Sequence, residues 1–246
     1  MARSPEHNRL ARERSRESLL QAAIDVFAER GIDGATIADI TGRAGVAQGL
    51  VNYYFGGKEQ LVSAVIDRWF EVLVGIAYGA PAADVLLGST DVERVAPLAP
   101  VSAEERLAGI IDTVLGMSAV AFPLQRVILG LQQQPSTRAL YAAGEVRHVT
   151  AVAAAEDDVR AIFRERGATD PAVEEIMLRS VLDGIVGQAG IFGSSYPLES
   201  ARRWVHRLYS LPEPAEPLPG ATPPQPSGGG AAPRIRASAG TPPDLR

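Results

Sequence analysis

Apolar and polar positions alternate with a helical period in a short segment near the N-terminus. Ile37, Ile40 and Ala44 recur on one face of this segment, which predicts an amphipathic helix. The hydroxyl of Thr36 can accept a hydrogen bond from the free backbone N–H groups that open such a helix. Gly45 follows the last apolar position, where a glycine can adopt the left-handed conformation that ends a helix and turns the chain.

A second short helix is predicted from about Ala47 to Tyr54. Val51 and Phe55 lie four residues apart and are expected to point inward. The outer face is then polar and aromatic, and it consists of Gln48, Gly49, Leu50, Asn52, Tyr53 and Tyr54. Two short helices hinged at a glycine, with such a face on the second, predict a helix-turn-helix and make double-stranded DNA the first partner to consider.

The side chains of this region suit DNA in two ways. The amides of Gln48 and Asn52 can pair with the N6 and N7 edge of adenine in the major groove. The hydroxyl of a tyrosine and the ammonium of Lys58 suit phosphate oxygens, and a glycine allows the backbone to approach closely. The candidate DNA-binding residues are Thr36, Arg43, Gln48, Gly49, Leu50, Asn52, Tyr53, Tyr54 and Lys58.

The chain beyond this region also has helical patterning, and it carries no strand signal. A long amphipathic helix is expected over residues 58–77, and a proline-containing loop over residues 79–101. Ser102 and Glu105 have the spacing of a capping box, which opens the next helix. The further helices are expected at about 102–119, 122–134, 136–166, 171–192 and 197–210. The sequence therefore predicts an all-α protein.

The helix-turn-helix, together with the helix at residues 22–31 before it, resembles the TetR family of transcriptional regulators. The resemblance rests on Phe27, Gly31, Thr36, Ile40, Ala44, Gly45, Val46, Gly49, Tyr53, Phe55, Lys58 and Leu61. It implies a three-helix DNA-binding domain, a variable helical domain that binds a small molecule, and a homodimer on a near-palindromic operator. Ala47 stands where a serine or threonine commonly caps the recognition helix, and Asn52 where an aromatic residue is common, so the operator sequence cannot be transferred from a relative.

The composition changes abruptly after Leu211. Residues 212–246 contain ten prolines and five glycines, which predicts a disordered tail with too little apolar matter to fold. We therefore expect a helix-turn-helix DNA-binding domain at residues 1–57, a helical-bundle domain for ligand binding and dimerisation at residues 58–211, and this Pro/Gly-rich tail.

Several other functions lack support in the sequence. The chain has no cysteine, which excludes disulfides, thiolate metal sites and cysteine nucleophiles. His7, His148 and His206 lie in separate segments without metal-ligand spacing, so neither a metal nor a cofactor is expected. No phosphate loop or nucleophile elbow indicates an enzyme. No stretch approaches the roughly 18 unbroken apolar residues that span a bilayer, so we expect a cytoplasmic protein without a membrane partner.

The net charge of −5 does not oppose DNA binding, because the excess of acidic residues lies outside the first domain. Residues 1–60 carry eight Lys or Arg and eight Asp or Glu, and the local field governs contact with DNA. Five arginines lie before or at the start of the first helix: Arg3, Arg9, Arg12, Arg14 and Arg16. They could reach phosphates or a minor groove, or form a solvated terminus.

The resemblance also suggests where an effector would bind. Family members bind effectors between the helix that follows the DNA-binding domain and the three after it. The bulky or polar candidates on those helices are Trp69, Met117, Phe122, Arg126, Tyr141, His148 and Met177. Arg126 stands on an otherwise apolar helix, where a guanidinium could pair with a carboxylate ligand, with solvent or with a neighbouring glutamate.

The last two helices carry candidate dimer-interface stripes. One consists of Ile176, Ser180, Gly184, Ile185 and Gln188, and the other of Trp204, Leu208 and Tyr209. Small residues allow close approach, and two such helix pairs related by a two-fold axis would form a four-helix interface. The alternative is that these stripes pack inside one subunit.

The sequence thus predicts a ligand-responsive transcriptional regulator, most simply a repressor released from its operator by a small molecule. Two alternatives stay open. One is a TetR-like activator or a regulator that answers to no ligand, and the other is a helical ligand-binding protein without operator function.

Overall fold

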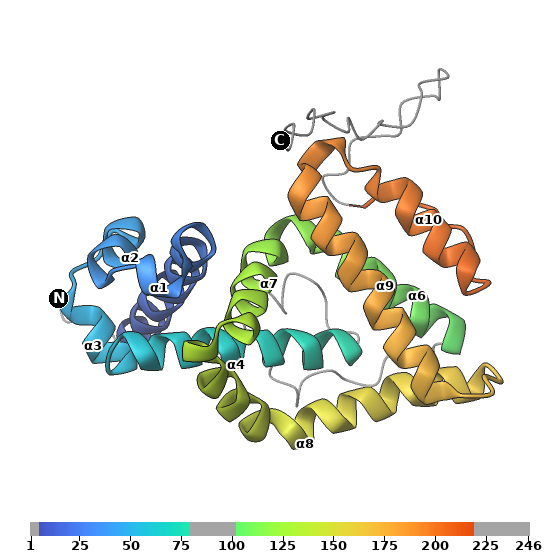
Figure 1. The fold of residues 1–246 in the computed structure, drawn as a ribbon, viewed down its shortest axis with the longest axis horizontal. Coiled ribbons are helices and arrows are strands. Elements are labelled where there is room, and N and C mark those ends of the chain that lie inside the picture. The colour runs from blue at the N-terminus through green and yellow to red at the C-terminus, as the bar shows by residue number, and fades with distance from the viewer. Residues whose placement is uncertain (1–4, 79–101, 219–246) are drawn as a thin grey trace, which may run out of the picture.

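The computed structural model describes residues 5–78 and 102–218 of the chain, and within those ranges every regular element is a helix (Figure 1). The all-α prediction is therefore confirmed for the described residues. The elements are α1 Pro5–Gly34, α2 Ile37–Ala44, α3 Gly49–Phe55, α4 Lys58–Ala77, α6 Ala103–Gly116, α7 Ser118–Gln133, α8 Pro135–Glu165, α9 Pro171–Phe192, the 3-10 helix η2 Gly193–Ser195, and α10 Leu198–Leu208.

Local hydrogen bonds define α2 as the sequence predicts. The Thr36 hydroxyl accepts a hydrogen bond from the Asp39 N–H, at 3.1 Å, and the Asp39 carboxylate accepts one from the Thr36 N–H, at 3.1 Å. This reciprocal pair is a capping box. Gly45 ends the helix with φ 68°, a left-handed conformation that costs a glycine little. The chain then turns, and Val46 packs against the core between the helices.

The three-helix head formed by α1, α2 and α3 shares its hydrophobic core with the body. Leu19, Ile40 and Val51 are fully buried in the head, and the same cluster continues into α4 through Leu61 and into α7 through Leu131. Figure 1 shows α4 leading from the head into the body, where it packs against α7 and α8. A second cluster joins α6, α8, α9 and α10. The head thus packs against the body, in addition to its covalent link to the body through α4.

The boundary between α6 and α7 differs from the prediction. The expected end near Ala119 and the expected start at Phe122 are replaced by an end at Gly116 and a start at Ser118. Met117 joins the two helices and is only 2% exposed. Burial of this junction favours a tight turn between α6 and α7. The helix α7 then continues through Pro123. The predicted loop at residues 79–101 lies outside the described residues.

The first residues of the expected tail pack on the body. Leu218 is buried in the second cluster, the Arg202 guanidinium donates to the Glu216 carbonyl at 2.7 Å, and His206 Nδ1 lies 2.8 Å from the Pro212 carbonyl oxygen. Residues from the start of the expected tail thus contact the body as far as Leu218. Composition could not show it, because the contacts come from α10. Residues 219–246 lie outside the described part of the chain.

A glycine sets the separation of α4 and α8. A Cβ atom at Gly144 would lie 2.3 Å from Cγ2 of Ile66, a fully buried side chain on α4. We expect Gly144→Ala to lower the free energy of unfolding by about 1–3 kcal/mol through overpacking. Gly109→Ala is the matched control, because no heavy atom lies within 4 Å of its added Cβ; it should stabilise α6 by up to about 1 kcal/mol. Chemical denaturation of both variants tests this, and equal effects would contradict it.

Candidate nucleic-acid interface and effector cavity

The outer face of α3 is smaller than the sequence suggests. Gln48, Gly49, Asn52 and Tyr53 are exposed, and Tyr53 has 66% of its surface accessible. Leu50 and Tyr54 are instead half-buried, since they pack against the core of the head. Four residues can therefore contact a DNA groove without rearrangement: Gln48, Gly49, Asn52 and Tyr53.

Two of the cationic or polar candidates already have partners within the head. Arg43 donates to both carboxylate oxygens of Glu29, at 2.7 and 2.6 Å. The Lys58 ammonium donates to the Ala35 carbonyl at 2.6 Å. Together with the Thr36 cap described above, these bonds hold α2 and the start of α4 in place. The bonds of Thr36, Arg43 and Lys58 thus help to position α3. A phosphate contact by any of these three residues would have to share or replace those bonds.

A buried arginine ties the head to α4. Both terminal nitrogens of Arg68 donate to the Glu17 carboxylate of α1, each at 2.8 Å, and its Nε lies 3.2 Å from Glu71. The Arg68 side chain is only 7% exposed. Burial opposes its charge, yet the hydrogen bonds and charges of Glu17 and Glu71 outweigh burial and raise the pKa of Arg68. The guanidinium is therefore a fixed charged link between α1 and α4.

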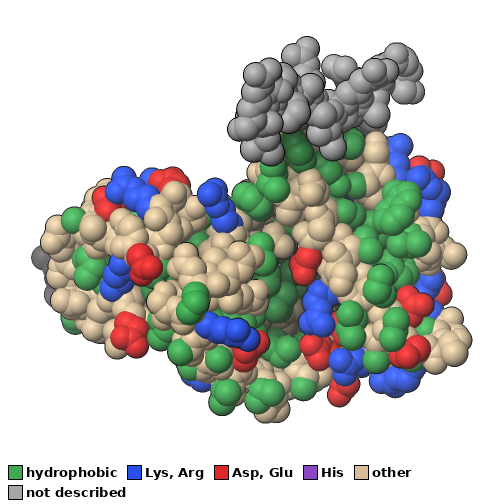
Figure 2. All heavy atoms as spheres, viewed as in Figure 1, with side chains coloured by type: hydrophobic (Ala, Val, Ile, Leu, Met, Phe, Trp, Pro, Cys, Tyr) green, Lys and Arg blue, Asp and Glu red, His purple; other side chains and the backbone are tan. Residues whose placement is uncertain are grey.

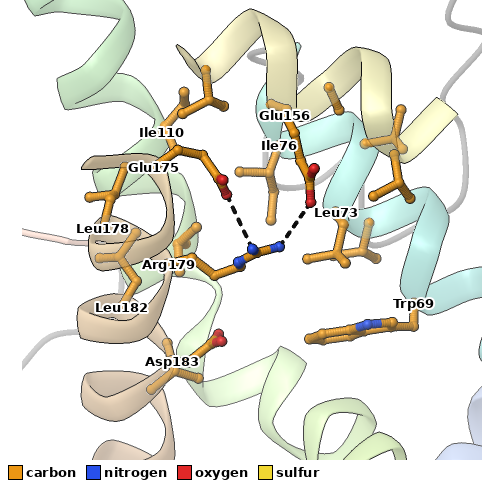
Figure 3. A pocket seen from close by; sticks show the side chains of 18 of the residues that line it. Trp69, Leu73, Ile76, Ile110, Glu156, Glu175, Leu178, Arg179, Leu182 and Asp183 are labelled. Atoms are coloured by element: carbon orange, nitrogen blue, oxygen red, sulfur yellow. Dashed lines mark hydrogen bonds and ion pairs between the residues drawn. The ribbon is translucent and has the colours of Figure 1, made fainter. Parts of the chain in front are cut away.

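A cavity of about 150 Å³, partly open to the surface, lies in the body and is lined by residues of α4, α6, α7, α8 and α9. Its wall is largely apolar, and α4 contributes Trp69, Leu73 and Ile76 (Figure 3). A cavity of this size, lined by apolar side chains, can hold an aromatic ring. The helix α4, which begins just after α3, thus forms one wall of this cavity.

Charged side chains gather on one side of the cavity (Figure 3). Arg179 of α9 lies 3.2 Å from Glu156 of α8 and 3.5 Å from Glu175, one turn earlier on α9. Asp183 follows one turn later and is exposed. The protein around it still desolvates its carboxyl and raises its pKa, with Arg179 opposing that shift. Gln125 of α7 also lines the cavity and is 7% exposed.

Only two of the seven residues expected at the effector site line this cavity, Trp69 and Met117. Arg126 is exposed on the other side of α7, because one residue along a helix rotates the side chain by about 100°. Its neighbour Gln125 takes the inward position. A carboxylate ligand held by Arg126 in this cavity is therefore not supported.

The other four candidates have structural surroundings of their own. Phe122 fills the space beside Gly190, where an added Cβ would lie 1.9 Å from its ring. Tyr141 packs against Phe70 in the core. His148 stacks on Phe70, and its Nε2 lies 2.9 Å from Asp67. Met177 is 51% exposed. Sequence reasoning missed Glu175, Arg179 and Asp183, although their spacing of four residues on an apolar helix was a usable signal.

The proposed dimer stripes lie mostly at the surface. Ile176, Ser180, Gly184 and Gln188 are exposed on α9, and Trp204 and Leu208 are about half exposed on α10. Ile185 instead belongs to the core, and Tyr209 packs beside Phe163. Figure 2 shows hydrophobic side chains gathered over α9 and α10. The exposed large apolar residues on these helices are Val173, Ile176, Met177, Ile191, Phe192, Trp204 and Leu208.

The apolar character of α9 also shows in its hydropathy. The segment Pro171–Ser195 is long and apolar enough to cross a membrane by length and composition alone, with a mean hydropathy of 1.2 and 22% of the window buried. A helix that packs one side on its own core and the other on a second subunit has the same composition. Among the described residues, no group of three His, Asp or Glu side chains could hold a metal ion.

These features define a helical protein with an N-terminal helix-turn-helix and a cavity-bearing body. Residues 19–65 match the family model described as bacterial regulatory proteins, tetR family. An HTH-type transcriptional repressor of Mycobacterium tuberculosis, Rv3405c, is 41% identical over 80 residues, which are 32% of this chain and 43% of that relative. The chain thus spans less than half the length of this relative.

Two further likenesses extend beyond the head. The HTH-type transcriptional regulator BetI of Cronobacter sakazakii is 27% identical over 202 residues, covering 76% of this chain and 85% of that protein. The crystal structure of the transcriptional regulator FadR from Bacillus subtilis in complex with stearoyl-CoA has a TM-score of 0.54 at 19% identity, and the match covers 78% of this chain and 95% of that one. Residues 19–65 thus carry the match to the tetR family of bacterial regulatory proteins, and the likeness to FadR over the rest of the chain concerns the fold.

Proposed function

We propose that this protein is a ligand-responsive transcriptional repressor that binds a near-palindromic operator as a homodimer. The observation that carries the proposal is the course of α4, which begins at the helix-turn-helix and forms a wall of the cavity. An occupant of that cavity contacts the same rigid element that supports the reading head.

The exposed face of α3 suits the major groove. Gln48 and Asn52 offer amides to base edges, and Tyr53 offers a hydroxyl to a phosphate or a base. Gly49 leaves room for close backbone approach. Within the head, the hydrogen bonds of Thr36, Arg43 and Lys58 hold the exposed face of α3 in a fixed orientation without DNA. This lowers the entropic cost of binding DNA.

The exposed apolar surface of α9 and α10 supports a dimer. Isolated exposed apolar side chains are ordinary, but seven large ones on two adjacent helices are typical of an interface. A two-fold axis through this surface would place two heads on one operator, whose half-sites lie about 34 Å apart in successive major grooves.

Effector and operator would then compete through the spacing of the heads. A ligand that displaces Trp69 or Leu73 would tilt α4, and the Arg68–Glu17 bond would carry that tilt to α1. A shift of a few ångströms between the heads misaligns them with successive grooves. Linkage requires that the operator weaken ligand binding by the same factor, typically about 5- to 150-fold.

Two other functions would fit parts of the structure. A TetR-like activator or a ligand-independent regulator would keep the head and the dimer, and a ligand-binding protein without operator function would keep only the cavity. Sequencing the genomic fragments that the purified protein retains distinguishes them. Enrichment of a near-palindromic motif in promoter regions supports operator binding, and random retention contradicts it.

The reading of bases by Asn52 can be tested by substitution. Asn52→Ala should cost about 1–3 kcal/mol on the operator and relax preference at one position in each half-site. Lys58→Ala should weaken binding to all sequences, and a phosphate contact would reduce the salt slope by about 0.9. Fluorescence anisotropy on operator and random DNA across a salt series measures both. Equal losses for Asn52→Ala on the two DNAs would contradict base reading.

The dimer surface can be tested with a charge placed on its stripe. Gly184→Arg adds a side chain where no heavy atom of the subunit lies within 4 Å, so the subunit should fold. The two-fold axis would bring two unpaired arginines into the interface, and we expect monomers that no longer bind the operator. Gly109→Arg, also exposed and uncrowded but on α6, should remain dimeric. Light scattering that finds a Gly184→Arg dimer would place the interface elsewhere.

A further inference from the structure

The charges that line the cavity do not cancel. Three carboxylates line it, those of Glu156, Glu175 and Asp183, but only one cation, Arg179. Arg160 supplies a second positive charge from α8, since its Nη2 lies 3.0 Å from Glu156 and 3.5 Å from Glu175. Both glutamates are thus paired, whereas Asp183 makes no hydrogen bond or ion pair within the described residues. The excess negative charge of the cavity therefore resides on Asp183.

Buried hydrogen-bond acceptors point to the same deficit. Gln125 is 7% exposed, and its Oε1 has no hydrogen-bond partner among the described residues. Glu175 is 5% exposed, and its Oε2 has no hydrogen bond, only the Arg160 ion pair at 3.5 Å. Buried acceptors without donors are costly and uncommon in folded proteins. A molecule that brings hydrogen-bond donors into the cavity would remove part of this cost.

We propose that the effector is a small amphipathic cation, with an apolar body against α4 and a protonated amine paired with Asp183. The inference rests on the proposed function, because it names the ligand class of the same cavity. Trp69 lies across the cavity from Arg179 (Figure 3), and an indole face also favours a nearby ammonium group. Asp183 lines the cavity and is itself exposed, so an ammonium group that enters the cavity can reach its carboxylate.

An anionic effector fits this cavity poorly. Arg179 already faces Glu156 and Glu175, so a ligand carboxylate would compete with two fixed carboxylates and be repelled by Asp183. Arg126 is on the exposed side of α7 and offers no second cation. The stearoyl-CoA in the FadR structure is bound by a protein only 19% identical to this one, and such a likeness concerns the fold.

Three probes with the same aromatic body and different charge test the proposal. They are 2-phenylethylammonium, 2-phenylethanol and 3-phenylpropanoate, titrated into the full-length dimer by calorimetry. We expect the ammonium probe to bind at least tenfold more tightly than the alcohol, and the carboxylate to bind most weakly. Asp183→Asn should abolish the tenfold preference. Asp158 is exposed like Asp183 but lies on α8 outside the cavity, so Asp158→Asn should keep the preference.

Stability serves as an independent check on the variants. Because Asp183 is exposed and makes no hydrogen bond or ion pair within the described residues, Asp183→Asn should leave the melting temperature nearly unchanged, so that lost binding is not lost folding. The proposal is overturned if the carboxylate binds most tightly, if all three probes bind equally, if none binds at millimolar concentration, or if Asp183→Asn retains the preference.

Release of operator DNA, measured in parallel, separates this proposal from the proposed function. If 3-phenylpropanoate both binds and releases the operator, the ligand class is wrong and the regulatory function stands. If the ammonium probe binds through Asp183 but leaves operator affinity unchanged, the ligand class is supported and induction through the cavity is contradicted.

Discussion

The arrangement of head and body depends on one buried ion pair, that of Arg68 with Glu17. It joins α1 to α4 at the point where α4 leaves the DNA-binding head and enters the body. A guanidinium in such a place is tolerated only when carboxylates satisfy it, so the pair constrains the angle between the two helices. The Arg68 side chain is 7% exposed and that of Glu17 is 31% exposed, so the pair is only partly shielded from water. The head therefore cannot turn independently of α4.

The link between α1 and α4 matters for the cavity, because α4 also forms part of the cavity wall. Trp69 is the next residue after Arg68, and a side chain that lines the cavity is thus adjacent in sequence to the one that holds α1. An occupant needs no long chain of intermediate contacts to influence the head. The polar side of the cavity, around Arg179 and Asp183, lies on α9, which also carries the proposed dimer surface. Effector, operator and subunit contact would in this way act on two helices, α4 and α9.

Local chemistry made the head predictable, and tertiary contacts made the site harder to predict. The capping residues around Thr36 and the turn at Gly45 are sequence-local, and the structure has both as expected. Arg126 lies outside the cavity because of helix phase, since a shift of one residue from Gln125 turns the side chain away from it. The Arg68–Glu17 pair joins residues 51 positions apart, and no periodic pattern in the sequence predicts such a contact. The packing of Leu218 was hidden by the prolines around it.

The most direct test of the central claim measures whether the ion pair fixes the heads. The chain has no cysteine, so Asp33→Cys, at an exposed position near the C-terminal end of α1, places one spin label on each head of the proposed dimer. Pulsed electron resonance should give a narrow distance distribution with Glu17 intact and a broad one in the Glu17→Gln background, with weaker operator binding. Identical narrow distributions and equal operator affinities would contradict the account.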